Sequence, residues 1–165
     1  AAGGGTWRPF DSLIEYFGRA SINSYSGYTT AQVCAQFNIQ NVAGAFDTSL
    51  VILNAGVNDD LSTSSKRDAS LSILSAAINA LGHTNYKVCG LLFKYTCTST
   101  PGAEWTTTTN AATYAAVSAY NTMLLEKFGS KFIDMQGISV ASYDPTSTAD
   151  VAAVATGVDW GISAS

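Results

Sequence analysis

Two polar segments of the sequence each contain residues suited to holding a negatively charged oxygen. Residues 54–59 read Asn-Ala-Gly-Val-Asn-Asp and follow directly on the apolar run of residues 49–54, and residues 22–30 include Gly27. A carbonyl oxygen that becomes an alkoxide requires two or three hydrogen-bond donors already aimed at it, each worth about 3 kcal/mol. The amide of Asn58 is an uncharged donor, and Gly27 lets the backbone approach a ligand closely. The alternative interpretation is that Asn and Asp beside Gly simply form a turn.

The order of these segments resembles that of the SGNH (GDSL-like) hydrolases. Gly-Val-Asn-Asp at residues 56–59 is similar to the third conserved block of the family, and residues 22–30 are similar to its second block. Residues 115–136 resemble the family's penultimate helix and last strand, in which a Tyr-Asn helix leads to a strand ending in Asp. The resemblance covers nearly the whole chain. It implies that the backbone N–H of Gly27 and the side chain of Asn58 form the oxyanion hole of a serine esterase.

The family's nucleophile is the Ser of a Gly-Asp-Ser motif at the end of the first strand, which makes Ser12 a candidate because it follows Asp11. Two features argue against Ser12. Residues 3–9 are rich in Gly and end in Pro, so they are unsuited to form the strand that should precede it. Asn23 follows only eleven residues later, which is too short for a turn, a crossover helix and another strand. We therefore expect Asp11 and Ser12 in the first turn of a helix, where an acidic residue is favourable.

The general base of the family is the His of a late Asp-x-x-His motif. No His follows Asp134, and the one histidine, His83, precedes its expected strand, roughly 20 Å from the carboxyl-end loops. We expect His83 to be a surface or internally hydrogen-bonded residue at a helix–strand junction. The resemblance thus implies that the family's first strand and last catalytic loop, with the Ser and the Asp/His pair, lie outside these 165 residues, in a longer chain. Residues 144–162 loosely resemble SGNH domains of bacteriophage tail proteins, which implies a virion or a bacterial surface and a larger assembly or oligomer.

Apolar runs and helical spacings predict the elements that position these segments. Strands are expected at residues 20–23, 49–54, 86–95 and 131–134, and helices at residues 9–17, 30–37, 71–81, 114–128 and 149–156. This alternation predicts an α/β fold, a single domain spanning residues 1–165 with a three-layer α/β/α, flavodoxin-like parallel sheet. The run at residues 49–54 is expected to be buried on both faces of that sheet. Ligands bind outside the carboxyl ends of such strands, so the site is expected in the loops that follow them.

Composition excludes several classes of function. Charged residues make up 12% of the sequence and the net charge is −4, so nucleic acid is not an expected partner. No apolar stretch is long enough to span a bilayer, and the N-terminus lacks the pattern of a signal peptide. Cys89 and Cys97 are expected at opposite ends of one strand, too far apart for a disulfide. No Cys or His pair has metal-ligand spacing, so neither a metal nor another cofactor is expected.

Two functions follow from the resemblance. The first is an esterase that acts on small esters, such as O-acetyl groups of glycans, by acylation of a Ser. The alternative is a catalytically inactive SGNH-fold module with a glycan-binding or structural role in a viral or other assembly. A flavodoxin-like domain that binds a phosphorylated ligand is disfavoured, because no glycine-rich phosphate loop follows any expected strand.

Overall fold

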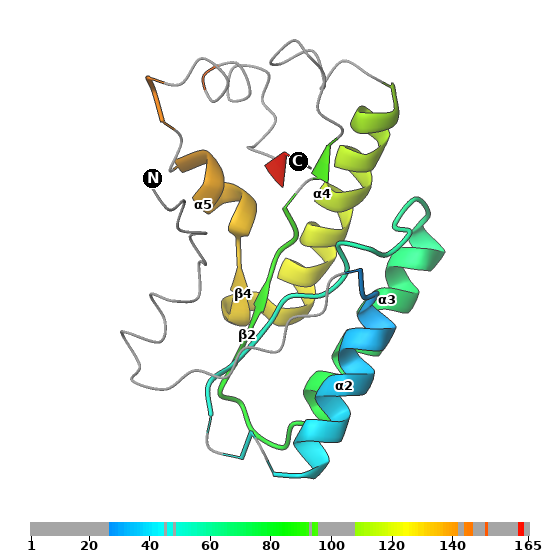
Figure 1. The fold of residues 1–165 in the computed structure, drawn as a ribbon, viewed down its shortest axis with the longest axis vertical. Coiled ribbons are helices and arrows are strands. Elements are labelled where there is room, and N and C mark those ends of the chain that lie inside the picture. The colour runs from blue at the N-terminus through cyan, green and yellow to red at the C-terminus, as the bar shows by residue number, and fades with distance from the viewer. Residues whose placement is uncertain are drawn as a thin grey trace, which may run out of the picture.

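Helices and strands alternate along the chain in the computed structural model, which describes residues 27–44, 46–47, 49–92, 94–95, 108–141, 144–146, 151 and 162–163 (Figure 1). In chain order the elements are α2 (Thr30–Val42), β1 (Val51–Leu53), α3 (Ser64–Asn79), β2 (Tyr86–Cys89), β3 (Lys94–Tyr95), α4 (Thr108–Phe128), the 3₁₀ helix η2 (Gly129–Lys131), β4 (Phe132–Ile133), α5 (Met135–Ala141) and β5 (Ile162–Ser163). The predicted helix at residues 9–17 and the strand at 20–23 lie outside the described residues. So does the helix at 149–156, apart from residue 151.

The main sheet has three parallel strands in the order β1-β2-β4. Leu53 lies beside Val88, and Cys89 lies beside Ile133. Helix α3 connects β1 to β2, and α4 lies in the connection from β2 to β4, because parallel neighbours require a long crossover. The mixed α/β class and the parallel sheet are as predicted.

Local capping determines where two of the helices begin. At the start of α2, the side chain of Gln32 accepts a hydrogen bond from the backbone N–H of Thr29, 3.0 Å. At the start of α3, the hydroxyl of Thr63 accepts from the backbone N–H of Lys66, 3.3 Å. Helix α3 therefore begins well before residue 71, where the apolar spacing alone placed it.

The principal core lies between the sheet and helices α2, α3 and α4, of which α2 and α3 lie side by side in Figure 1. Leu74, Leu124 and Tyr120 are fully buried within it, and Val88 brings the central strand into the same cluster. Complete burial of one such aliphatic side chain is worth roughly 1.5–3 kcal/mol. The helices that bracket the expected site are therefore held by one shared core.

The predicted strand at residues 86–95 is wrong as a single strand. The chain leaves the main sheet after β2, and β3 pairs instead with β5 in a separate two-stranded parallel sheet. The contacts of Asn121 explain the break, because its side chain binds both the N–H and the C=O of Leu91. Both backbone polar groups of Leu91 are therefore bonded to a side chain and cannot extend the ladder. The single strand expected between Cys89 and Cys97 is therefore interrupted, and Cys97 lies outside the described residues.

The strand predicted at residues 49–54 is shorter than expected and is not buried on both faces. Val51 and Leu53 are buried, whereas Ile52 between them is 38% exposed. Within the described sheet β1 has a neighbour on one edge alone. A further element, α5, went unpredicted, although Asp134 marks its start by accepting a hydrogen bond from the backbone N–H of Gly137, 2.9 Å.

Candidate functional site

The carboxyl ends of the three parallel strands lead into loops at one edge of the main sheet. Residues 54–59 follow β1, residues 90–92 follow β2, and Asp134 follows β4. Strands that run in the same direction bring such loops together, which is where ligands bind in open α/β sheets. The candidate site is therefore built from these loops and from the segment that enters α2.

Asn58 lies against the segment that contains Gly27. Its Nδ2 donates a hydrogen bond to the carbonyl oxygen of Tyr28, 3.1 Å, across thirty positions of sequence. Only the nitrogen of the amide can face a carbonyl oxygen, so this contact sets the orientation of the side chain. One of the two N–H groups on Nδ2 makes this bond, and because Asn58 is exposed the second can reach a ligand. The structure thus brings together the two segments named from the sequence.

Gly27 and Gly56 have conformations that favour glycine, for different reasons. Gly27 has a φ of +80° with open space where a Cβ would stand, so backbone conformation alone selects glycine there. Gly56 has a φ of +121°, and a Cβ would lie 3.2 Å from Leu91 and 3.3 Å from Tyr120. At Gly56 close packing therefore adds to the conformational requirement.

A turn holds Asn58 in place. The backbone N–H of Asp59 donates to the carbonyl oxygen of Gly56, 2.9 Å, which closes a four-residue turn around Val57 and Asn58. The simple turn interpretation of this motif is thus correct for the backbone. It is compatible with the donor interpretation, because the turn leaves the amide of Asn58 at the surface.

The carboxylate of Asp59 connects two helices. Its Oδ1 accepts from the backbone N–H of Thr30 at the start of α2, 2.8 Å, and its Oδ2 accepts from the hydroxyl of Ser70 in α3, 2.5 Å. Thr30 is fully buried and Ser70 is 8% exposed. A carboxylate at the N-terminus of a helix is also favoured by the helix dipole. Sequence reasoning assigned no role to Asp59.

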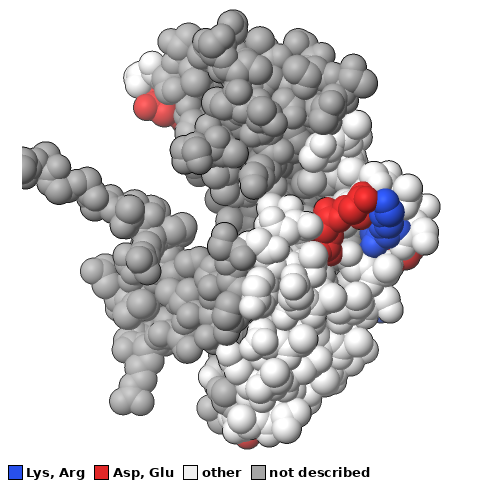
Figure 2. All heavy atoms as spheres, turned by 45° about the vertical axis from the view of Figure 1, so that its right-hand side comes forward, with Lys and Arg blue, Asp and Glu red and all other residues white. Residues whose placement is uncertain are grey.

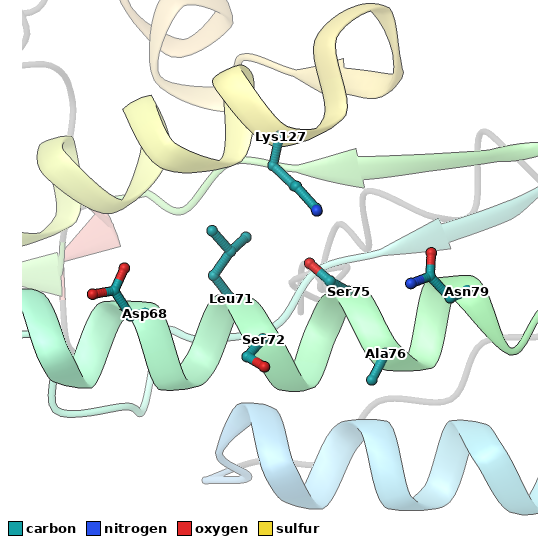
Figure 3. Close-up of a pocket in the computed structure, with 7 residues that line it drawn as sticks. All are labelled: Asp68, Leu71, Ser72, Ser75, Ala76, Asn79 and Lys127. Carbon is teal, nitrogen blue, oxygen red and sulfur yellow. The ribbon is translucent and has the colours of Figure 1, made fainter.

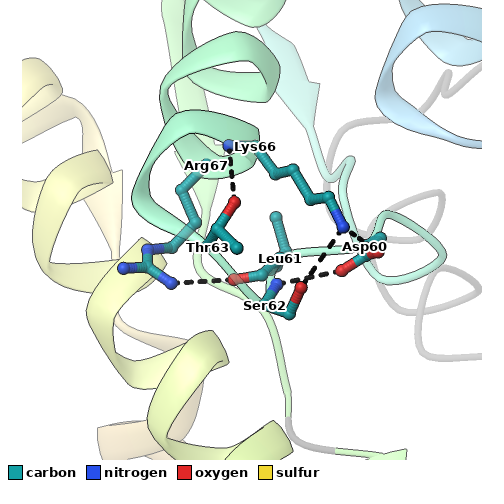
Figure 4. A network of polar contacts seen from close by, with 6 residues as sticks. All are labelled: Asp60, Leu61, Ser62, Thr63, Lys66 and Arg67. Atoms are coloured by element: carbon teal, nitrogen blue, oxygen red, sulfur yellow. Dashed lines mark hydrogen bonds and ion pairs between the residues drawn. The ribbon is translucent and has the colours of Figure 1, made fainter.

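Polar contacts also attach the end of this loop to the first turns of α3 (Figure 4). Lys66 forms an exposed ion pair with Asp60, and a guanidinium N–H of Arg67 donates to the carbonyl oxygen of Leu61, 2.8 Å. The hydrogen bond from Lys66, with further bonds from Ser62, holds the pKa of the Asp60 carboxyl well below its usual range. Because Asp60 is exposed, this ion pair contributes little to stability.

A buried cluster of polar side chains lies beneath the turn. Tyr120 and Thr30 are fully buried, and neither hydroxyl has a hydrogen-bond partner of normal geometry among the described residues. Burial raises the pKa of the Tyr120 hydroxyl, Asp59 and Cys34 add to the rise, and Thr30 opposes part of it. Burial also raises the pKa of the Cys34 thiol to about 11, again with a contribution from Asp59. These groups therefore stay protonated at neutral pH.

Asn121 ties the loop after β2 to α5. Its side chain accepts from the N–H of Leu91, 2.8 Å, donates to the carbonyl oxygen of Leu91, 2.9 Å, and donates to Gln136, 2.8 Å. Asn121 is 7% exposed and lies on the same face of α4 as Val117 and Leu124. An Asn on the apolar face of a predicted helix is the sequence feature that could have indicated this role.

His83 does not belong to the site. It lies between α3 and β2, at the amino end of the strand, and its Nε2 contacts the carbonyl oxygen of Phe46, 2.8 Å. Its Nδ1 accepts from the backbone N–H of Asn85, 3.2 Å, so both ring nitrogens are engaged. The prediction that His83 is an internally hydrogen-bonded residue at a helix–strand junction is confirmed.

The remaining sequence predictions concern the nucleophile, metal ions, the membrane and surface charge. Ser12 is outside the described residues. Among the residues that are described, no cluster of His, Cys, Asp and Glu is arranged to hold a metal ion, and no helix is long and apolar enough to cross a membrane. Figure 2 shows acidic and basic side chains next to each other, surrounded mostly by uncharged residues where the structure is described.

A pocket of about 430 Å³ lies elsewhere, between α3 and α4 (Figure 3). Lys127 projects from α4 over a row of α3 residues that includes Asp68, Leu71 and Ser75. None of its lining residues belongs to the loops after β1, β2 or β4. The pocket and the candidate site are therefore separate features.

Comparison with known proteins returned no matching family model, no matching curated protein and no matching solved structure.

Proposed function

We propose that this chain is part of an SGNH-type serine esterase that acts on small esters such as O-acetyl groups of glycans. In this proposal the backbone N–H of Gly27 and the side chain of Asn58 stabilise the oxyanion formed when a serine attacks the ester carbonyl. The observation that carries the proposal is the hydrogen bond from Asn58 Nδ2 to the carbonyl oxygen of Tyr28, the residue after Gly27. It joins the two segments that would have to converge, and the second N–H of the exposed Asn58 amide would be the donor to the oxyanion.

The arrangement of the sheet supports the proposal further. In the SGNH fold a first strand that carries the nucleophile would pair with the edge of β1 opposite β2. Within the described sheet that edge has no neighbour. We assign the nucleophile and the Asp/His pair to parts of the protein outside the described residues. A glycan substrate would suit a phage tail or a bacterial surface, the settings that the resemblance implies.

The test is the variant Asn58→Ala in the complete protein, with hydrolysis of p-nitrophenyl acetate as the readout. Loss of one donor to the oxyanion should lower kcat about 100-fold or more, because the missing hydrogen bond is strongest in the transition state. The matched control is Asn79→Ala, an exposed Asn at the end of α3. The free energy of unfolding of each variant should lie within about 1 kcal/mol of that of the wild type. Unchanged kcat in a folded Asn58→Ala variant would show that Asn58 is not an oxyanion donor.

The second candidate is a catalytically inactive module that binds a glycan or serves as a structural part of an assembly. The observation that favours it is the position of His83, the single histidine of the sequence, whose ring nitrogens are both engaged at the amino end of β2. If this candidate is correct, the complete protein should not hydrolyse acetyl esters. It should instead bind acetylated oligosaccharides with equal affinity before and after treatment with a serine-directed phosphonate.

A further inference from the structure

We propose that Asp59 is a positioning residue that keeps Asn58 and the Gly27 segment in the relative placement that oxyanion binding requires. This inference rests on the proposed function. It assigns to the last residue of the Gly-Val-Asn-Asp motif a role through its neighbours, since the side chain of Asp59 binds Thr30 in α2 and Ser70 in α3.

Three hydrogen bonds place Asp59 at the meeting point of the two donor segments. Its backbone closes the turn with Gly56, which fixes the loop that contains Asn58. Its Oδ1 accepts from the N–H of Thr30, three residues after Gly27, which fixes the entry into α2. Its Oδ2 accepts from Ser70, so the whole arrangement is anchored to α3.

The surroundings of Asp59 make these bonds difficult to replace by water. Thr30 is fully buried and Ser70 is 8% exposed, so each would lose its partner in an interior position if the carboxylate were removed. Asp59 also lies near the buried Tyr120 and Cys34, whose pKa values it raises. Movement of the turn would therefore disturb a packed interior as well as the surface.

Asp60 provides a matched comparison within the same loop. It is exposed, and its bonds reach Lys66 and Ser62, all within six positions of sequence. These bonds of Asp60 therefore stay at the start of α3, and among the described residues none reaches the segment before α2. Removal of Asp60 should leave the two donors in place, although it removes the same charge from the adjacent position.

The first experiment follows the side-chain amide of Asn58 by NMR in the complete protein, which needs no activity. In Asp59→Ala, the signal of the Asn58 N–H that is bonded to Tyr28 should move toward the position of a solvated amide and exchange with water at least about tenfold faster. In Asp59→Asn this signal should stay close to the wild type, because an Asn can accept from Thr30 and donate to the Ser70 hydroxyl. Asp60→Ala should also leave it unchanged.

If Asp59→Ala fails to fold, Ser70→Ala serves in its place, because it removes one of the two side-chain anchors and should give a smaller change in the same signal. Unchanged Asn58 signals in a folded Asp59→Ala variant would overturn the proposal. So would an equal change in Asp60→Ala.

The second experiment measures p-nitrophenyl acetate hydrolysis. Displacement of the donors should lower kcat by between about 10- and 100-fold with little change in KM, and Asp59→Asn should recover most of the loss. If the wild type has no esterase activity, the proposed function fails while the NMR measurement still decides whether Asp59 positions Asn58. A fall in kcat that Asp59→Asn does not recover would overturn the positioning role and assign the effect to charge.

Discussion

Individual residues in the loop after β1 have little freedom, because backbone conformation and packing act on them together. Gly56 combines a φ of +121° with neighbours on two sides, from Leu91 and from Tyr120. Asn58, two residues later, is held by its contact with Tyr28 yet remains at the surface. The same turn therefore supplies rigidity at one residue and an accessible donor at another.

Gly56→Ala tests this rigidity. The substitution should lower the free energy of unfolding by about 2 to 4 kcal/mol, because it adds a strained conformation to an overpacked contact. Urea denaturation gives the measurement. The control is Gly82→Ala, which has a φ of +77° but open space around the added Cβ, and it should cost about 1 kcal/mol. Equal losses of unfolding free energy in the two variants would mean that the side chains of Leu91 and Tyr120 move aside at little cost.

At the level of elements, side chains rather than strand pairing decide where β2 ends and α5 begins. Asn121 on α4 binds the N–H and the C=O of Leu91 and donates to Gln136 in α5. The loop after the central strand is thereby joined to the helix that follows β4. This connection explains why the apolar run beyond Gly90 does not continue in the main sheet.

Asn121→Ala should lower the free energy of unfolding by about 3 kcal/mol, because the N–H and C=O of Leu91 are left buried without partners. Hydrogen exchange should increase around Leu91 and in α5, and urea denaturation gives the overall loss. Thr122→Ala, at the exposed neighbouring position, should change stability by about 0.5 kcal/mol or less. If exchange in α5 stays at the wild-type rate, Asn121 does not connect these two elements.

For the whole molecule, burial extends to both faces of the main sheet. Cys34 belongs to the core formed with α2, α3 and α4, and Cys89 is buried beside Val88, whose side chain points to the opposite face. Both are free thiols with a pKa raised by burial, to about 11 for Cys34. The two thiols therefore report on the closure of the two faces separately.

At pH 8, iodoacetamide should label Cys34 and Cys89 at least about 10³-fold more slowly in the folded protein than in denaturant, because global opening must come first. Mass spectrometry of the labelled peptides gives both rates. Rapid labelling of Cys89 alone would show that the second face of the sheet is open to solvent.

The free energy of unfolding should also fall as pH rises from about 9 to about 11, since the Cys34 thiol ionises first in the unfolded chain.

The sequence by itself determined the α/β class, the parallel strands, the start of α2 and the two segments in which donors were sought. These features depend on short-range patterns, such as apolar runs, helical spacing and capping residues. Such patterns favour the same local structure whatever the rest of the chain does. It also indicated correctly that His83 lies at the wrong end of its strand.

Only the tertiary structure decided that Asp59 joins α2 to α3, that the run beyond β2 leaves the sheet, and that Ile52 is exposed. The physical reason is that each depends on groups far apart in the chain. Asp59 and Thr30 are 29 positions apart, and Asn121 and Leu91 are 30. Local patterns carry no information on which distant polar group will satisfy a buried N–H, so that choice appears only when the chain is folded.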